Sequence, residues 1–303
     1  MPTYIVPRRI VGLNASRTRS KSPYQAALEA ARRGVRTARL GLLAQKLSLP
    51  YERSELVVPP DVAAKLDLAI ARARGQKKVL EDSGFRRRAP LGLRVLFVGP
   101  PGTGKTMAAQ VLARQLGLDL LRIDLSRVLS KYIGETEKNL AALFDSFKSS
   151  MLLFEEADAL RGKRSEVQDA HDRYSSMELN YLLQRIENHD GVTILATNAM
   201  QVLDPAFLRR LHIIVKFPMP SALDRQRIWE GMFPQQAKRD EDVDLALLAR
   251  EYELSGGEIK SATLAAAFLA AAEDRPIAMR HLTAAIHREL AKAGRAPSVA
   301  STL

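Results

Sequence analysis

Cysteine is absent from the 303 residues of this chain. The absence excludes disulfide bonds and any metal site built on thiolates, and it fits a reducing cytoplasm as the expected compartment. The five histidines show no spacing typical of metal ligands, so we expect them to be solvated or packed. No apolar run approaches the ~18 residues of a membrane-spanning helix. Met1 to Ser20 also lack the apolar segment of a secretory signal.

Acidic residues are scarce near the amino terminus. Residues 1–60 hold 11 Lys and Arg against 3 Glu, a net charge of +8, whereas residues 61–303 hold 35 basic against 31 acidic side chains, a net charge of +4. A basic segment docks on an acidic protein surface, nucleic acid or anionic lipid. A solvated leader and an organellar transit peptide have the same composition. We expect an acidic partner for this segment, with nucleic acid as the alternative.

Residues 1–50 are expected to form a basic amino-terminal arm that contains one helix. Ser22 is a good helix N-cap, and apolar residues then recur at spacings of three and four, which predicts a helix over residues 22–47. Pro50 and the pair Pro59 and Pro60 mark the end of the arm.

Residues 51–220 alternate short apolar runs with helical patterns and begin with a helix capped by Asp61. This alternation predicts an α/β domain, in which helices cover both faces of a parallel sheet. Strands are expected at residues 94–98, 118–123, 151–154, 192–196 and 213–217.

Residues 221–296 show no further strand pattern and predict a small all-helical domain, followed by a tail at 297–303. Buried apolar stripes are typical of such helices. Helices are expected near residues 222–232, 243–252, 256–273 and 279–293.

The segment GPPGTGKT, Gly99 to Thr106, joins the first expected strand of the sheet to a helical run. Its glycines let the backbone curl so that N–H groups face a phosphate, and the positive end of the helix dipole points to the same place. Lys105 can then reach the β and γ phosphates, and the Thr106 hydroxyl can bind Mg²⁺. The segment therefore predicts a nucleotide site.

Glu155 and Glu156 follow an apolar run, at the carboxyl end of a strand, where ligands bind in parallel sheets. One carboxylate can hold Mg²⁺ through a water molecule, and the other can take a proton from the attacking water. Side chains alternate along a strand, so the two can face different tasks.

Two later segments add polar groups. The run GVTILATNAM ends a strand in Thr197 and Asn198, whose amide can orient water near a γ phosphate. The adjacent Arg209 and Arg210 either balance the charge at the end of a helix or act as arginine fingers toward the ATP of a neighbouring subunit.

Five segments in this order resemble the AAA+ ATPases, in the protein-remodelling AAA subgroup: GPPGTGKT, SKYIGETEKNLAALF, LLFEEADAL, ILATNAMQVLDPAFLRRL and LSGGEIKSA. The resemblance covers residues 55–295. It implies a P-loop NTPase α/β domain with a C-terminal helical lid. It also implies hydrolysis of ATP to ADP and phosphate with Mg²⁺, in a homo-oligomer expected to be a hexamer that acts on a protein substrate.

The resemblance also implies residue roles. Lys105 and Thr106 match the Walker A positions. Glu155 and Glu156 match the Walker B pair, with Glu156 as the general base. Asn198 matches sensor 1.

The remaining roles concern the subunit edge, the lid and the metal. Arg209 and Arg210 match paired arginine fingers that act in trans, and Thr106 with Glu155 would hold the metal. The residues expected to contact the nucleotide are Gly99, Pro100, Pro101, Gly102, Thr103, Gly104, Lys105, Thr106, Met107, Gly256 and Gly257.

The sequence KYIG matches the first pore loop of the family, in which an aromatic and an aliphatic residue face the channel of the ring. An aromatic ring grips an unfolded chain through its surface area. The pore residues are Lys131, Tyr132, Ile133 and Gly134. The charged segment Gly162 to Ser175 is either a second pore loop or a solvated surface loop.

A narrower resemblance lies in FEEADALRGKRSEVQDAHDRYSSMELNYLLQRIE. This segment resembles bacterial AAA ATPases encoded with contractile, phage-tail-like injection particles.

One residue departs from the family pattern. Glu155 stands where the family usually has Asp, and its carboxylate lies one methylene further out. Because Mg²⁺ demands near-ideal octahedral geometry, the change leaves a slowly hydrolysing, nucleotide-dependent assembly scaffold as one alternative. A DNA-associated AAA+ initiator or loader is the other, and the basic arm favours it.

Overall fold

A six-stranded sheet organises the first part of the fold. It is seen in a computed structural model that describes residues 44–83, 92–125, 135–148, 150–156, 181–198 and 208–295. The strand order is β1-β3-β4-β5-β2-β6. The first strand along the chain therefore lies at one edge of the sheet, and the second lies near the other edge.

Five of these strands run parallel to one another, as the sequence predicts. All residues of the neighbouring strands β2 and β5 are buried, which is typical of a parallel sheet covered on both faces. The expected α/β class is confirmed. The bounds of the parallel strands are β2 Leu93–Val98, β3 Leu120–Asp124, β4 Met151–Glu155, β5 Val192–Thr197 and β6 Ile213–Lys216.

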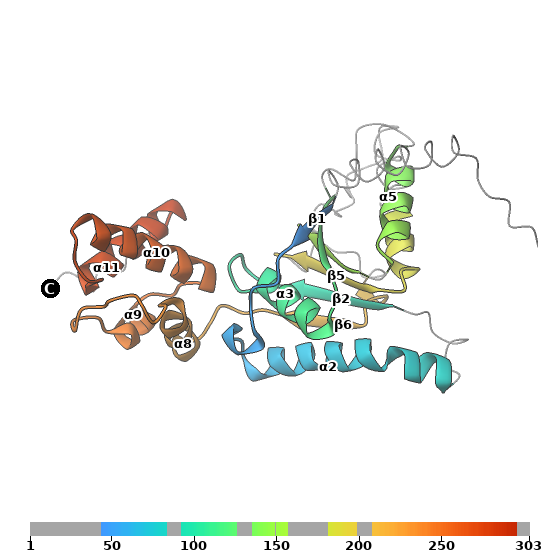
Figure 1. The fold of residues 1–303 in the computed structure, drawn as a ribbon, viewed down its shortest axis with the longest axis horizontal. Helices are drawn as coiled ribbons and strands as arrows, with labels where there is room; N and C mark the ends of the chain where they lie inside the picture. Colours follow the sequence, from blue (N-terminus) through green and yellow to red (C-terminus); the bar gives the residue numbers. More distant parts are fainter. Residues whose placement is uncertain are drawn as a thin grey trace, which may run out of the picture. The chain divides into compact units, whose positions relative to one another are not determined.

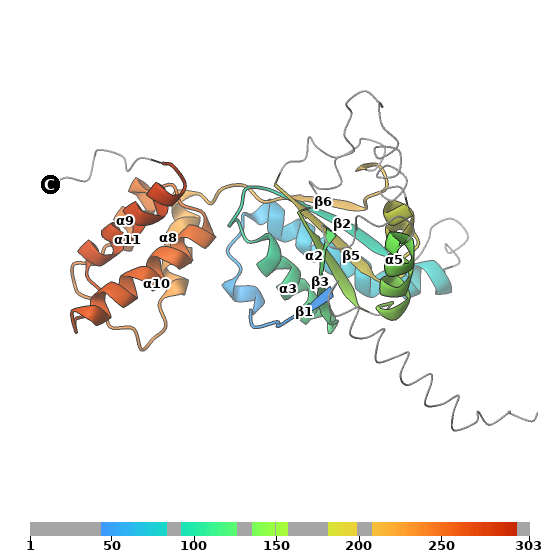
Figure 2. The same cartoon turned by 90° about the horizontal axis from the view of Figure 1, so that it is seen from above.

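Helices α2 (Pro60–Lys77) and α3 (Lys105–Leu116) pack on one face of the sheet. Helix α5 (Glu135–Ser146) lies on the other face, as Figures 1 and 2 show. The ring of Phe144 in α5 stacks on that of Phe154 in β4, with 6.1 Å between ring centroids. Apolar side chains from alternate strand positions thus fill two separate layers.

Helix α2 begins two residues earlier than the sequence predicts. Pro59 is its N-cap and Pro60 its first residue, so the expected cap at Asp61 is wrong. Proline fits the first turn because its missing N–H would have no helical partner there. A 3-10 turn, η1 (Arg53–Glu55), precedes α2, and the π-helical turn η2 (Lys78–Asp82) follows it.

The expected helix over residues 22–47 is wrong at its carboxyl end, because Ala44–Leu47 form strand β1. This strand pairs antiparallel with β3, from Ala44 opposite Ile123 to Leu47 opposite Leu120. The pairing satisfies backbone groups at the edge of β3, a gain that local apolar spacing cannot reveal. The sheet therefore begins before residue 51. The remainder of the expected arm lies outside the described residues and stays a prediction.

The helical region after residue 220 matches the four expected helices. They are α8 (Ala222–Met232), α9 (Leu245–Glu251), α10 (Gly256–Ala272) and α11 (Met279–Lys292). Its core gathers around Trp229, which is fully buried. Among the helices described, none is both long and apolar enough to cross a membrane.

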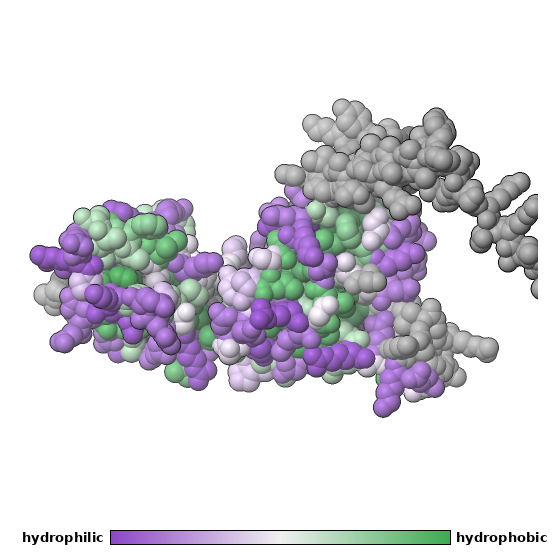
Figure 3. Space-filling view, viewed as in Figure 1, coloured by the Kyte–Doolittle hydropathy of each residue, from purple (hydrophilic) through white to green (hydrophobic). Residues whose placement is uncertain are grey.

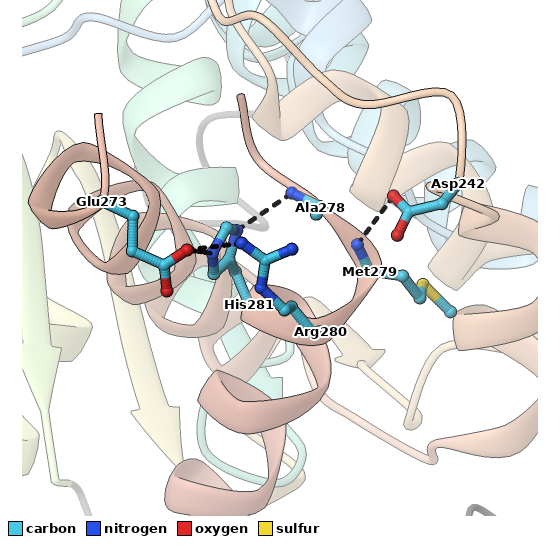
Figure 4. A network of polar contacts seen from close by, with 6 residues as sticks. All are labelled: Asp242, Glu273, Ala278, Met279, Arg280 and His281. Atoms are coloured by element: carbon cyan, nitrogen blue, oxygen red, sulfur yellow. Dashed lines mark hydrogen bonds and ion pairs between the residues drawn. The ribbon is translucent and has the colours of Figure 1, made fainter. Parts of the chain in front are cut away.

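Helix α11 is capped by residues other than its N-cap, Ala278, which has no capping side chain. His281 Nδ1 accepts the Ala278 N–H (3.0 Å), and Asp242 Oδ1 accepts the Met279 N–H (3.0 Å) (Figure 4). Glu273 pairs with Arg280 and lies 3.2 Å from His281 Nε2. This network ties the start of α11 to the end of α10 and to the loop before α9.

The outer side of α10 carries two exposed apolar residues. Leu264 and Phe268 expose 57% and 69% of their surfaces, and their spacing of four places them on one face of the helix. Figure 3 shows apolar surface over the helical region in the same view as Figure 1. Helix α10 thus has an apolar face toward solvent in addition to its buried one.

Candidate functional site

The loop between β2 and α3 contains the glycine-rich segment. Gly102 (φ 77°) and Gly104 (φ 96°) adopt left-handed conformations that side chains rarely tolerate. A Cβ at Gly102 would lie 2.5 Å from Ser255 Oγ. Thr103 Oγ1 donates to Pro100 O (2.8 Å) and closes the turn. The loop therefore has the backbone shape that a phosphate-binding segment requires.

Lys105 opens α3, and its ammonium group lies over the loop. Its Nζ donates to Gly99 O (2.6 Å), Pro100 O (2.9 Å) and Asn198 Oδ1 (2.9 Å). Asn198 comes directly after β5, which pairs with β2 in register from Leu93 opposite Val192 to Val98 opposite Thr197. The structure thus brings together two predicted site residues that are 93 positions apart.

Thr106 and Glu155 also meet at this edge of the sheet. Thr106 Oγ1 donates to Glu155 Oε1 (2.6 Å), so the longer side chain of Glu155 reaches the hydroxyl directly. A hydroxyl and a carboxylate are the oxygen ligands that Mg²⁺ prefers. The two residues therefore fit the metal that the sequence predicts.

Arg122, which sequence reasoning missed, pairs with the other oxygen of this carboxylate. Its Nη1 lies 3.5 Å from Glu155 Oε2, and its guanidinium also donates to Gln45 Oε1 in β1. An arginine inside the apolar run LLRID of β3 was the available signal. Strand β1 is thereby linked to the predicted metal ligands through one side chain.

Glu156 follows β4 with a left-handed backbone (φ 54°), which is rare for residues other than glycine. Such strain costs about 1–3 kcal/mol and clusters at functional sites. Glu156 is exposed and lies directly after the carboxyl end of β4. This conformation agrees with a role for Glu156 in the reaction.

The expected lid glycines lie against the phosphate loop. Gly256 and Gly257 open α10 after its N-cap, Ser255. The Gly257 N–H donates to Gly102 O (2.9 Å), and a Cβ at Gly257 would lie only 3.0 Å from the Gly102 Cα. Glycine at position 257 permits this close approach of two backbones.

Arg209 and Arg210 lie near the amino ends of the parallel strands, whereas the glycine-rich loop lies at their carboxyl ends. They precede His212, whose N–H donates to Arg94 O (2.9 Å) at the amino end of β2. The four steps from Arg94 to Val98 span about 13 Å, because a strand rises ~3.3 Å per residue. The structure therefore does not bring the arginine pair to the phosphate loop of its own chain.

The expected pore loop, Lys131 to Gly134, lies outside the described residues. So does the charged segment Gly162 to Ser175. Both remain predictions.

Comparison with known proteins finds one family to which this part of the chain is similar. Residues 95–219 match the AAA family, described as "ATPase family associated with various cellular activities". This range holds most of the predicted site, from the phosphate loop to the arginine pair.

Curated relatives cover a longer stretch of the chain. A proteasome-activating nucleotidase of Archaeoglobus fulgidus is 34% identical over 65% of this chain and 52% of its own length. The nucleotidase of Saccharolobus solfataricus is 31% identical over 64% of this chain and 52% of its own length. A 26S proteasome regulatory subunit 4 homolog of Oryza sativa is 33% identical over 65% and 45%, respectively.

This chain thus spans about half the length of the curated relatives it matches. Residues 95–219, which the family model matches, include the glycine-rich loop, both acids and the amide predicted for the site. From residue 95 to residue 219, this chain is similar to the ATPase domains of the AAA family.

Proposed function

We propose that this chain hydrolyses ATP as a subunit of a ring and uses the energy to remodel or unfold proteins. One observation carries the proposal. Lys105, Thr106, Glu155 and Asn198 meet at the carboxyl edge of the sheet, whereas Arg209 and Arg210 lie at its amino edge. Such a division suits a site completed by a neighbouring subunit.

Each residue at the carboxyl edge has a distinct task. Loop N–H groups and Lys105 bind the β and γ phosphates, and Asn198 orients the attacking water. Glu156 takes the proton of that water, whose oxygen attacks the γ phosphorus while the bond from this phosphorus to the departing ADP oxygen breaks. Thr106 and Glu155 would hold Mg²⁺, which neutralises charge on the phosphates when it is bound.

The names of the relatives support a protein substrate. They are called proteasome-activating nucleotidases and a 26S proteasome regulatory subunit. The expected pore residue Tyr132 fits this proposal, as do a hexamer, a cytoplasmic location and an acidic partner for the basic arm. The resemblance to ATPases of contractile injection particles is a narrower prediction within it.

The shared site is tested by mixing two inactive variants. Arg209→Ala keeps an intact site but offers no finger, and Glu156→Gln keeps its fingers but lacks the base. In a mixed ring, an Arg209→Ala site beside a Glu156→Gln neighbour is complete. We expect part of the activity to return on mixing and the specific activity of the wild type to rise with protein concentration.

A monomer in the presence of ATP, a rate independent of concentration and no rescue on mixing would contradict the ring. Stimulation of hydrolysis by unfolded protein rather than by DNA separates the remodeller from a DNA-associated ATPase. Absence of turnover with intact ATP binding would indicate the scaffold instead.

A further inference from the structure

The amino end of β2 contains a buried charge that the reaction does not use. Arg94 is 5% exposed, in a strand whose other residues are apolar. Burying a guanidinium is unfavourable unless its N–H groups are hydrogen-bonded.

The Arg94 guanidinium binds two backbone carbonyl groups from distant segments. Its Nε donates to Arg210 O (3.0 Å), and its Nη1 donates to Glu187 O (2.7 Å) at the end of the helical residues 181–187. Planar, rigid donors of this kind fix the orientation of their partners. Arg94 thus joins the turn that carries the arginine pair to a helix on the face of the sheet.

His212 completes the attachment of this turn. A neutral imidazole has one acceptor nitrogen, so it accepts either the Arg94 backbone N–H at Nδ1 (3.1 Å) or the guanidinium at Nε2 (3.0 Å). Burial, and then the charges of Arg94 and Arg72, lower the pKa of His212 to about 4. The ring is therefore neutral at physiological pH and can accept.

The side chain of Arg210 is held as well as its backbone. Its guanidinium pairs with the Glu187 carboxylate, and these side chains are 50% and 30% exposed. Within the ranges that the structure describes, the neighbouring Arg209 side chain is exposed and has neither a hydrogen bond nor an ion pair. The two adjacent arginines thus differ in their surroundings.

We propose that Arg209 is the residue offered to the neighbouring subunit, and that Arg94 and Glu187 position it by holding Arg210 within its own subunit. The inference rests on the proposed ring. A finger acts only when its backbone is in place before the neighbour arrives, since small misplacement greatly lowers the rate. Arg94, Glu187 and Arg210 are therefore positioning residues.

The test compares kcat and KM for ATP across four variants. We expect Arg209→Ala to lower kcat by roughly 10³–10⁵-fold. Glu187→Gln, Arg210→Ala and Arg94→Met should lower kcat by about 10- to 100-fold with an unchanged KM, because binding uses the other edge of the sheet. The double variant Glu187→Gln with Arg210→Ala should be no worse than either single variant.

A charge exchange supplies the readout that a merely structural role would not give. Glu187→Arg combined with Arg210→Glu should recover part of kcat. Asp145→Asn is the matched control, since Asp145 pairs with Arg185 of the same helical residues (3.0 Å) and contacts neither arginine of the pair. It should hydrolyse ATP as the wild type does. If Arg94→Met fails to fold, the variants of the half-exposed ion pair between Glu187 and Arg210 still test the positioning role.

Three outcomes would overturn the assignment. If Glu187→Gln and Arg94→Met retain full kcat while Arg209→Ala is inactive, the shared site stands and the positioning role falls. If Glu187→Gln raises kcat and Arg210→Ala is as poor as Arg209→Ala, Arg210 is itself a finger that Glu187 restrains. If Arg209→Ala is fully active, the proposed site shared between subunits is wrong, and the positioning role that rests on it is wrong as well.

Discussion

At the carboxyl end of β2 the Lys105 ammonium lies over a glycine-rich loop, whereas at the amino end the Arg94 guanidinium is buried. Lys105 bonds to two loop carbonyl groups and one amide, all within reach of solvent. Arg94 bonds to carbonyl groups of two segments that are 93 and 116 positions away. Lys105 thus holds its own loop and one residue 93 positions away, whereas both carbonyl partners of Arg94 lie in distant segments.

The difference reflects two demands. A site that admits ATP and releases ADP needs donors that can exchange carbonyl oxygens for phosphate oxygens. A surface that completes a neighbour's site needs fixed geometry, and buried charge-assisted hydrogen bonds provide it. Changes at the carboxyl end should therefore impair the subunit's own site, and changes at the amino end should impair the neighbour's.

Among changes at the carboxyl edge of the sheet, the largest effect is expected at Glu156. Glu156→Gln should lower kcat by about 10²–10⁴-fold, because the attacking water loses its base, while ATP binding stays intact. Single-turnover hydrolysis and equilibrium binding of a fluorescent ATP analogue measure the two quantities. A variant that hydrolyses at the wild-type rate would show that another group takes the proton.

Lys105→Ala should act on binding. Hydrogen bonds to a charged group contribute about 1.5–3 kcal/mol each, so ATP affinity should fall by at least roughly 10- to 100-fold. Lys148→Ala, in the exposed turn before the amino end of β4, is the control and should bind ATP normally. Equal affinity in Lys105→Ala and wild type would break the assignment of the carboxyl edge as the phosphate site.

Gly257→Ala should weaken ATP binding several-fold. The new Cβ would lie 3.0 Å from Gly102 Cα, so the phosphate loop and the start of α10 must separate. Gly231→Ala in α8 is the matched control, because nothing lies within 4 Å of its added Cβ. Isothermal titration of both variants compares them, and an equal loss in both would contradict the steric argument.

The smallest effect is a dependence of stability on pH at the amino end. The pKa of His212 is lowered to about 4, mainly by burial, from an ordinary value of 6.5. Between these values the unfolded chain binds more protons, so stability should fall as pH drops from 6.5 toward 4.

Thermal unfolding of the wild type and of His212→Asn across this range measures the effect. The stability of the variant should decline less steeply as the pH falls. Part of the decline should remain, because burial also lowers the pKa of His189. The pKa of Glu273 is also lowered from its ordinary value of 4.5, chiefly by its hydrogen bond to Arg280. Glu273 therefore contributes to the loss of stability only below about pH 4.5. Identical slopes in both proteins would exclude His212 as the cause.

Much of the fold could be predicted from local sequence patterns. The five parallel strands and the four carboxyl-terminal helices lie within a few residues of their predicted bounds, because apolar runs and helical spacing reflect burial that those segments achieve in place. Strand β1 was not predicted from its local sequence pattern. Its four residues gain order from the edge of β3, about 75 positions downstream, rather than from their own sequence.

The sequence by itself determined which side chains gather at the carboxyl edge. A glycine-rich loop, a lysine, a threonine and two acids at strand ends have to meet once the strands are parallel, because parallel strands share one carboxyl edge. The tertiary structure alone decided that the arginine pair lies at the far end of β2. It also decided that Arg94 holds that turn, since a buried guanidinium chooses carbonyl partners that only folding brings within reach.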